Sequence, residues 1–379
     1  SPARSPIAPV AAPNASAAVR PIVDCHTHTR FSDGEPTFEE NIRAAAAAGC
    51  RIMVSTDHLT LPASMDPAGE VQVTLTDLPA HRAAFESARG LAARIAPNLE
   101  VVYGFECDWY PGCEENVGHW SAGAVVRLGS VHWIGEVGDI RLAAGEAGSR
   151  NVTRADSPAS DNGWIDDGSD LHVWINLGAD EVWRRYADAW CRACESPLAF
   201  DIMAHPDLAM RFANEGLAPA RDLAPLWDQM VACARDTGRR IEVSTAGLRK
   251  TVDDYYPTRS LLERFARAGV PIALGSDSHR ARDICWGIRD AQAYAYSCGY
   301  RSFDAPHADG DWETFSLETP RGPLIRMPSG PPYALLGIHL GTQGFQLHLA
   351  ALVEPLDGLA HNLLGVSGWM QQMRSTFIP

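Results

Sequence analysis

The sequence predicts an α/β fold built on a parallel sheet, and three observations support this prediction. From Pro21 to about Tyr300, short apolar runs alternate with segments of helical periodicity, as in repeated βα units. Hydrophobic residues make up 46% and charged residues 21% of the chain, an ordinary globular composition that excludes a disordered chain. The length of 379 residues suits either two or three average domains or one α/β barrel.

Seven apolar runs are short enough to be strands. In chain order they are Ile22–Cys25, Arg51–Ser55, Glu100–Phe105, Val125–Val131, Ala199–Ala204, Arg240–Val243 and Pro271–Gly275. Between them, Thr37 begins a capping box (TFEE) that opens an Ala-rich helix ending at Gly49, and Ser260–Glu263 opens another that ends at Gly269. Apolar residues at helical spacing predict three more helices: Asp77–Ile95, Ala179–Cys194 and Pro219–Thr237.

Two regions interrupt this alternation within a domain expected to span residues 21–304. Residues 135–178 are rich in Gly, Asp, Ser and Asn, and we expect them to form a long loop or lid insertion. Residues 305–379 begin with turn residues, and we expect a C-terminal extension of unknown role. Residues 1–20 are rich in Ala and Pro and are predicted to be a flexible tail.

Charge and cysteine content argue against several classes of protein. With 32 Lys and Arg against 47 Asp and Glu, the formal net charge is −15, which disfavours a nucleic-acid or anionic-membrane binder. No stretch of about 18 residues is apolar throughout, so we expect no membrane span. The nine cysteines are odd in number and contain a single C-x-x-C, at Cys191–Cys194. We interpret them as reduced thiols of a cytoplasmic protein.

Histidines and carboxylates follow nearly every predicted strand. Six of the 13 histidines and two carboxylates have such positions: His26, His28, His58, Glu106, His132, His205, Asp277 and His279. The carboxyl ends of the strands in a parallel barrel meet at one mouth, so we expect these side chains to converge. Burying these polar groups without partners would cost free energy. Divalent metal ions would provide the partners, because imidazole and carboxylate are good ligands for Zn, Mn or Fe. Eight ligands exceed one tetrahedral site, so two or three divalent ions are expected.

Simpler explanations apply to each residue taken alone. A single strand-end histidine such as His58 is more often structural than a ligand, and a lone H-x-H or D-x-H pair is ambiguous. Asp57 is interpreted either as a partner of a metal ligand or as a helix cap. The other seven histidines, such as His81 and His119, are interpreted as surface or packing residues. The joint pattern nevertheless favours a metal site over separate structural histidines.

The order of these motifs resembles that of the polymerase-and-histidinol-phosphatase (PHP) superfamily of metal-dependent phosphoesterases. Asp24–Thr29 (DCHTHT) is similar to its first motif, Ser55–His58 (STDH) to its second and Gly275–His279 (GSDSH) to its last. Two longer stretches resemble the histidinol-phosphatase branch. They are Phe200–Leu208 (FDIMAHPDL) and Ile241–Lys250 (IEVSTAGLRK), the latter followed by Tyr256-Pro257. The likeness extends from about Ile22 to Tyr300.

This resemblance implies a distorted (β/α)7 TIM-like barrel that holds up to three metal ions. By position, the implied ligands are His26, His28, Glu106 and Asp277 for the first ion, Glu106, His132 and His205 for the second, and His58 and His279 for the third. Family members often supply a further ligand shortly after the first motif, where this chain has only Asp33. Ser244 is another departure, because the phosphatase branch usually has Asn there.

The resemblance also implies a reaction. The expected substrate is a small phosphate monoester, L-histidinol phosphate, hydrolysed to histidinol and phosphate in histidine biosynthesis by a hydroxide that the ions activate. Arg249, with Lys250 beside it, is the candidate for holding the phosphate, since guanidinium matches phosphate oxygens. His205 and Asp277 are the other catalytic candidates, His205 as a proton donor. The acidic residues of the insertion either attract the substrate's amino group or form a solvated loop: Asp156, Asp161, Asp166, Asp167 and Asp170.

Two other functions stay open. One is a different phosphoesterase on the same scaffold, acting on another small phosphate, a nucleotide or nucleic-acid ends. The net charge of −15 and the lack of an aromatic and basic strip disfavour nucleic acid. The other is a metal-binding module without turnover, which the intact ligand set argues against. A homo-oligomer is compatible with the sequence.

Overall fold

Seven parallel strands form the centre of the structure, a computed structural model that describes residues 20–138, 140 and 161–318. They lie in the order β1 (Ile22–Asp24), β2 (Cys50–Ser55), β3 (Glu100–Asp108), β4 (Val126–Ser130), β7 (Ile202–Met203), β8 (Arg240–Ser244) and β9 (Ile272–Gly275). The last strand returns to the first, because the Cys25 N–H donates to the Leu274 carbonyl at 2.8 Å. The strands are thereby nearly closed into the predicted seven-stranded barrel.

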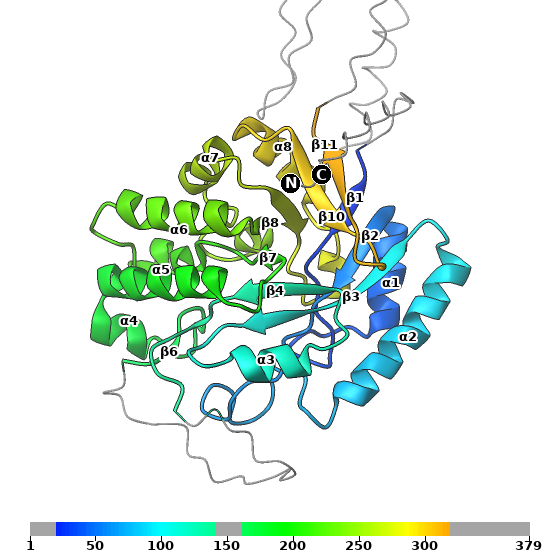
Figure 1. The fold of residues 1–379 in the computed structure, drawn as a ribbon, viewed down its shortest axis with the longest axis horizontal. Coiled ribbons are helices and arrows are strands. Elements are labelled where there is room, and N and C mark those ends of the chain that lie inside the picture. Colours follow the sequence, from blue (N-terminus) through cyan, green and yellow to red (C-terminus); the bar gives the residue numbers. More distant parts are fainter. Residues whose placement is uncertain (1–19, 139, 141–160, 319–379) are drawn as a thin grey trace, which may run out of the picture. The chain divides into compact units, whose positions relative to one another are not determined.

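Helices follow the strands and cover their outer face (Figure 1). They are α1 (Phe38–Ala47), α2 (Leu78–Ile95), α3 (Glu114–Trp120), α4 (His172–Leu177), α5 (Ala179–Glu195), α6 (Ala224–Thr237), α7 (Arg259–Arg267) and α8 (Ile288–Ser297). Short 3-10 helices occur at Leu208–Met210, Ala213–Glu215, Ala246–Arg249 and Ala281–Asp283. Helices on one face and side chains inside the barrel on the other leave the strands buried along nearly their whole length. This burial explains their continuous apolar runs.

The first predicted helix has the capping box that its sequence indicates. The Glu40 N–H donates to Thr37 Oγ1 at 3.2 Å, and the Thr37 N–H donates to the Glu40 carboxylate at 2.8 Å. Gly49 follows the helix with a φ of 70°, a left-handed conformation that glycine adopts without a steric penalty. The start and end of this helix are therefore confirmed.

Other boundaries differ from the prediction for local reasons. Helix α6 begins at Ala224 instead of Pro219, because Asp180 accepts the N–H groups of Ala220 and Arg221 and holds them in a loop. Thr258, not Ser260, is the residue that precedes α7. Strand β7, which corresponds to the fifth predicted strand, Ala199–Ala204, is only two residues long. Strand β3 runs on to Asp108 because its pairing with β4 continues to that residue.

The two interrupting regions contain more structure than expected. The insertion predicted at 135–178 includes β6 (Gly163–Trp164), which pairs antiparallel with β5 (Trp133–Ile134), and also helix α4. The boundary predicted between residues 304 and 305 falls inside β10 (Ser302–Pro306), which forms a hairpin with β11 (Trp312–Ser316) and packs beside β9. Buried side chains of this hairpin extend the domain to about Leu317. The predicted N-terminal tail and the rest of the C-terminal extension lie almost wholly outside the described residues.

Candidate metal centre

Glu106 lies at the centre of the candidate site, inside β3 and not after it. One of its carboxylate oxygens, Oε2, lies 3.0 to 3.4 Å from the Nε2 atoms of three imidazoles: His26, His28 and His58. The other, Oε1, lies 2.9 Å from His205 Nε2 and 3.7 Å from His132 Nε2. A single buried carboxylate thus meets five histidines that come from the ends of four other strands.

Two further carboxylates complete the cluster. Asp277 Oδ1 lies 3.3 Å from His28 Nε2 and 3.6 Å from His279 Nδ1. Asp33 Oδ2 lies 3.0 Å from His279 Nε2 and 3.8 Å from His58 Nε2. The structure therefore brings together all eight predicted strand-end side chains and also Asp33.

Within this cluster, potential ligand atoms gather into three groups. The groups are His26, His28 and Asp277; His58, Glu106 and His132; and His28, Asp33, His58 and His279, and within each group the ligand atoms lie within 4.8 Å of one another. The third group contains four candidate ligands, because Asp33 stands with His279 and His58. The second group contains His58, whereas the family resemblance implies His205 at that place. His205 contacts Glu106 Oε1, the oxygen that also faces His132, whereas His58 faces Oε2.

The donor atoms of the cluster fit divalent ions such as zinc. Both ring nitrogens of His28 and the Nδ1 atom of His205 are buried, and within the described residues they have no hydrogen-bond partner. Buried polar atoms are normally paired, so His205 Nδ1 needs a partner from elsewhere, whereas the two His28 nitrogens lie 3.3 to 3.4 Å from carboxylate oxygens of Asp277 and Asp33. Imidazole and carboxylate are suitable ligands for Zn, Mn and Fe, in agreement with the expectation from the sequence.

Electrostatics show that the cluster favours added positive charge. Burial lowers the pKa of His28, but the neighbouring carboxylates of Asp277 and Glu106 outweigh it and raise that pKa to about 9. Burial alone would raise the pKa of Glu106, but the imidazoles, His58 first among them, hold it well below its usual range. Without metal ions, a proton on His28 therefore supplies positive charge that helps to balance the buried carboxylates.

Asp108 supports two of the imidazoles from behind. It accepts hydrogen bonds from the Nδ1 atoms of His58, at 2.8 Å, and His132, at 2.6 Å. Each bond leaves the Nε2 atom of the ring facing Glu106. The sequence analysis missed Asp108, although its spacing from Glu106, two residues along one strand, places both on the same face. A carboxylate behind a histidine orients a ligand and raises its basicity.

Glu242 has the corresponding role for His26 and is the other residue that the sequence analysis missed. Its Oε1 atom lies 2.9 Å from His26 Nδ1, and its Oε2 atom accepts the backbone N–H of His205 at 2.8 Å. A fully buried carboxylate within the apolar run of β8 was the signal that could have identified it.

Asp57 supports the loop that carries Asp33. It accepts hydrogen bonds from the Thr29 hydroxyl and the Ser32 hydroxyl, both at 2.7 Å, and contacts His81 Nε2 at 2.9 Å. It is neither a helix cap nor part of a ligand group. His81 is a packed residue, as expected, but it also has this specific polar partner.

Of the two predicted phosphate-binding residues, Arg249 contacts the candidate site and Lys250 lies at the solvent-exposed surface. Arg249 lies beside the Asp277 backbone, and its guanidinium donates to the carbonyls of Ser276 and Asp277 at 2.6 and 3.0 Å. Lys250 is exposed. Arg249 therefore reaches the edge of the cluster, whereas the structure gives Lys250 no comparable anchor among the described residues.

The acidic residues of the insertion do not behave as one group. Asp170 contacts His172 Nδ1 at 2.7 Å, and Asp161 lies 3.7 Å from an arginine of α5. Asp166 is half-buried and adjoins Ile165, whose N–H donates to the His132 carbonyl at 2.8 Å. Asp156 lies outside the described residues. Asp166 is thus the acidic residue that the chain places beside the cluster.

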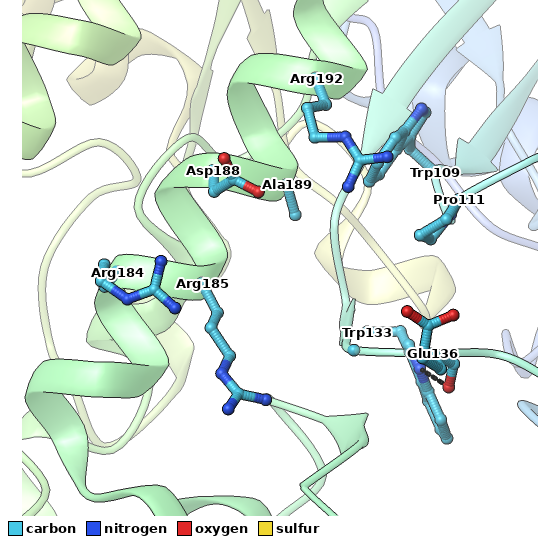
Figure 2. A pocket seen from close by; sticks show the side chains of 10 residues that line it. Trp109, Pro111, Trp133, Glu136, Arg184, Arg185, Asp188, Ala189 and Arg192 are labelled. Carbon is cyan, nitrogen blue, oxygen red and sulfur yellow. Dashed lines mark hydrogen bonds between the residues drawn. The ribbon is translucent and has the colours of Figure 1, made fainter.

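A separate cavity of about 200 Å³ lies beside α5 (Figure 2). Three arginines of that helix, Arg184, Arg185 and Arg192, line it together with Trp109 and Trp133. The Arg192 guanidinium stands 4.9 Å from the centre of the Trp109 ring, and the other two arginines pair with a carboxylate of their own helix. None of the predicted ligands lines this cavity, so it is a feature distinct from the cluster.

Two further observations concern the cysteines and the helices. All nine cysteines are free thiols, including the C-x-x-C pair. Among the helices within residues 20–138 and 161–318, none is both long and apolar enough to span a lipid bilayer.

Comparisons with known proteins add to this geometry. The profile of the PHP domain matches residues 24–246, more than half of the 379 residues. A Deinococcus radiodurans protein named probable histidinol-phosphatase is 27% identical over 293 residues, which cover 76% of this chain and 97% of that protein.

Two solved structures share the fold. The hisK protein of Listeria monocytogenes matches with a TM-score of 0.56 and 19% identity, over 70% of this chain and 98% of that chain. The histidinol phosphate phosphatase of Lactococcus lactis, solved in complex with zinc, L-histidinol and phosphate, matches with a TM-score of 0.56 and 18% identity, over 77% of this chain and 98% of that chain. These matches confirm the predicted barrel.

Proposed function

Because the chain belongs to the PHP-domain family, we propose that it is a metal-dependent phosphomonoesterase that hydrolyses L-histidinol phosphate to L-histidinol and phosphate. The observation that carries this proposal is the convergence of five imidazoles on the two oxygens of Glu106. The named relatives support the choice of substrate, because both the Deinococcus and the Lactococcus proteins are called histidinol phosphatases.

Three ligand groups would hold two or three divalent ions. Glu106 belongs to the second group and lies 3.0 Å from His26 of the first, while Asp33 and His279 would complete the third. When bound, such ions lower the pKa of a coordinated water and neutralise the charge on phosphoryl oxygens. The carboxylates Asp108 and Glu242 would keep the ligand imidazoles oriented during turnover.

The chain's own residues would act on the two ends of the substrate. The phosphate contact predicted for Arg249 and Lys250 stays a prediction; Arg249 lies at the edge of the cluster, where its guanidinium donates to the Asp277 carbonyl. His205 is proposed to donate a proton to the leaving alcohol, since its Nδ1 atom is buried without a partner among the described residues and its Nε2 atom faces Glu106. Asp166, which is half-buried and follows Ile165 in the chain, is proposed to attract the substrate's ammonium group; the Ile165 N–H donates to the His132 carbonyl.

A panel of substrates tests this proposal. We expect phosphate release from L-histidinol phosphate to exceed, in kcat/KM, release from other phosphomonoesters, from nucleotides and from a 5′-phosphorylated oligonucleotide. Preference for one of the other compounds would reject L-histidinol phosphate as the substrate but would still support a phosphoesterase activity. No release from any compound by metal-replete protein would favour a binding module without turnover.

A further inference from the structure

The backbone around Asp277 has a conformation that needs support. The φ angle of Asp277 is 50°, in the left-handed region that residues other than glycine rarely adopt. Aspartate tolerates this region better than most residues, but the surrounding structure must still stabilise it. In this conformation the carboxylate lies 3.3 Å from His28 Nε2 and 3.7 Å from His26 Nε2. The position of this candidate ligand therefore depends on the backbone that carries it.

Asp24 holds this backbone from the side of β1. Its carboxylate accepts the Ser276 N–H at 2.8 Å, the Ser276 hydroxyl at 2.6 Å and the Cys285 N–H at 2.8 Å. Asp24 is fully buried. The donors of Ser276 are thus satisfied, and the Asp277 carbonyl lies 3.2 Å from His279 Nδ1, but the Ser276 carbonyl needs a different partner.

Arg249 supplies that partner. Its Nη2 atom donates to the Ser276 carbonyl at 2.6 Å and to the Asp277 carbonyl at 3.0 Å, while Nη1 donates to Thr245 Oγ1 at 3.2 Å. Only 18% of the Arg249 side chain is exposed. The Thr245 hydroxyl is itself fixed, because it donates to the Trp286 carbonyl at 2.9 Å. The guanidinium is therefore held in place on several sides.

The donors of Arg249 are mostly in use. A guanidinium has five N–H groups, and both on Nη2 and one on Nη1 are taken by the contacts above. A two-pronged grip on a phosphate would require Arg249 to release the backbone carbonyls. The geometry favours a main role that acts through Asp277.

We propose that Arg249 is a positioning residue, which clamps the Ser276–Asp277 peptide against Asp24 so that the Asp277 carboxylate meets His26 and His28. This inference rests on the proposed function, because it treats Asp277 as an ion ligand. Arg249 then determines ion affinity and turnover more than substrate affinity, and any contact with the phosphate is secondary.

The experiment compares Arg249→Ala and Arg249→Lys with the wild type and with Arg267→Ala, a control at an exposed arginine of α7. Zinc affinity is measured by competition with a chelator, and kcat, KM and inhibition by inorganic phosphate are measured on zinc-loaded protein. In Arg249→Ala we expect the affinity for one zinc ion and kcat to fall about 10-fold or more, as for other residues that orient metal ligands. KM and the phosphate inhibition constant should stay within about 3-fold of wild type. The zinc affinity and kcat of Arg249→Lys should lie between those of Arg249→Ala and wild type, and those of Arg267→Ala should match wild type.

The opposite pattern would overturn the inference. Unchanged zinc affinity in Arg249→Ala, with KM and the phosphate inhibition constant raised about 10-fold, would make Arg249 a phosphate contact only. If Arg249→Ala does not fold, Arg249→Lys decides, because wild-type zinc affinity in that variant would also reject the clamp. The zinc measurement needs no turnover, so it remains decisive even if wild-type protein hydrolyses no phosphate ester and the proposed function fails.

Discussion

The carboxylate of Glu242 lies directly behind the imidazole of His26, with Oε1 2.9 Å from Nδ1. The opposite ring nitrogen, Nε2, lies 3.0 Å from Glu106 at the centre of the cluster. One nitrogen of the ring, Nδ1, is therefore directed toward a supporting carboxylate, and the other, Nε2, toward the candidate ion site. This relationship fixes which nitrogen is available as a ligand.

Replacing Glu242 with Gln should weaken ion binding while leaving the fold intact. The amide keeps the shape but not the charge that makes the His26 ring more basic. We expect zinc affinity to fall about 10-fold, measured by chelator competition, because partners of this kind typically contribute 10- to 100-fold. Glu263→Gln, at a partly exposed position on α7, is the matched control. Equal affinities in Glu242→Gln and in the control would show that this carboxylate does not support a ligand.

Adding a methyl group at Gly275 should disturb the same contact. A Cβ atom there would stand 2.0 Å from Glu242 Oε1 and 2.8 Å from His26 Cβ, so one of these side chains would have to move. We expect Gly275→Ala to lower the free energy of unfolding by about 1–3 kcal/mol, the usual cost of overpacking. Gly90→Ala, on α2, where the added Cβ atom would lie 3.9 Å from Arg94 Nη1, should instead raise the free energy of unfolding by about 0.5–1 kcal/mol. Chemical denaturation measures both, and similar values for the two variants would argue against the close approach.

Removal of Asp33 should affect one ion only. Asp33 contacts His279 and His58 in the third ligand group but lies outside the other two. We expect Asp33→Ala to bind one ion fewer per chain than wild type under saturating zinc, whereas Asp311→Ala, in the exposed β10–β11 turn, should bind the full number. Elemental analysis of gel-filtered protein gives the count. Loss of all ions, or of none, would contradict a separate third group.

Ion binding should release protons and become tighter as the pH rises. Burial opposes charge on His28 and His132, but nearby carboxylates raise the pKa of each to about 9 in the absence of metal. Below that pH an incoming ion must displace these protons, so the apparent zinc affinity should increase from pH 6 toward about 9 and then level off. Calorimetric titration in buffers of different ionisation enthalpy measures the protons released. An affinity independent of pH over this range would contradict protonated imidazoles in the metal-free site.

Local patterns in the sequence predicted the parallel strands and the converging side chains, and the family resemblance implied the seven-stranded barrel. Apolar strands buried on both faces are easily recognised, and a histidine directly after a strand has only one end of the barrel to occupy. Asp108 and Glu242 were missed because the histidines they support are distant in the sequence; a carboxylate inside an apolar strand indicates a buried role but not which side chain it supports. The same applies to Arg249, whose identity suggests a phosphate contact but whose position beside Asp277 only the folded chain reveals.

The insertion and the C-terminal boundary were harder to predict. Strands β5 and β6 are two residues each, too short for any periodic pattern, and their pairing joins segments about thirty residues apart. The turn-rich sequence that predicts the start of an extension at residue 305 forms the end of β10 and the turn that joins it to β11. The burial of this hairpin beside β9 comes from tertiary packing, which no local pattern in residues 302–316 indicates.

The central claim is that the converged imidazoles and carboxylates hold the ions on which phosphate-ester hydrolysis depends. The most direct measurement follows phosphate release from L-histidinol phosphate and ion content in the same samples: native protein, chelator-stripped protein, stripped protein resupplied with Zn or Mn, and the variants His26→Ala and Asp277→Asn. We predict that release disappears with the ions, returns when they are restored, and is abolished in both variants together with part of the ion content. Undiminished hydrolysis by ion-free protein, or by either variant, would contradict the account.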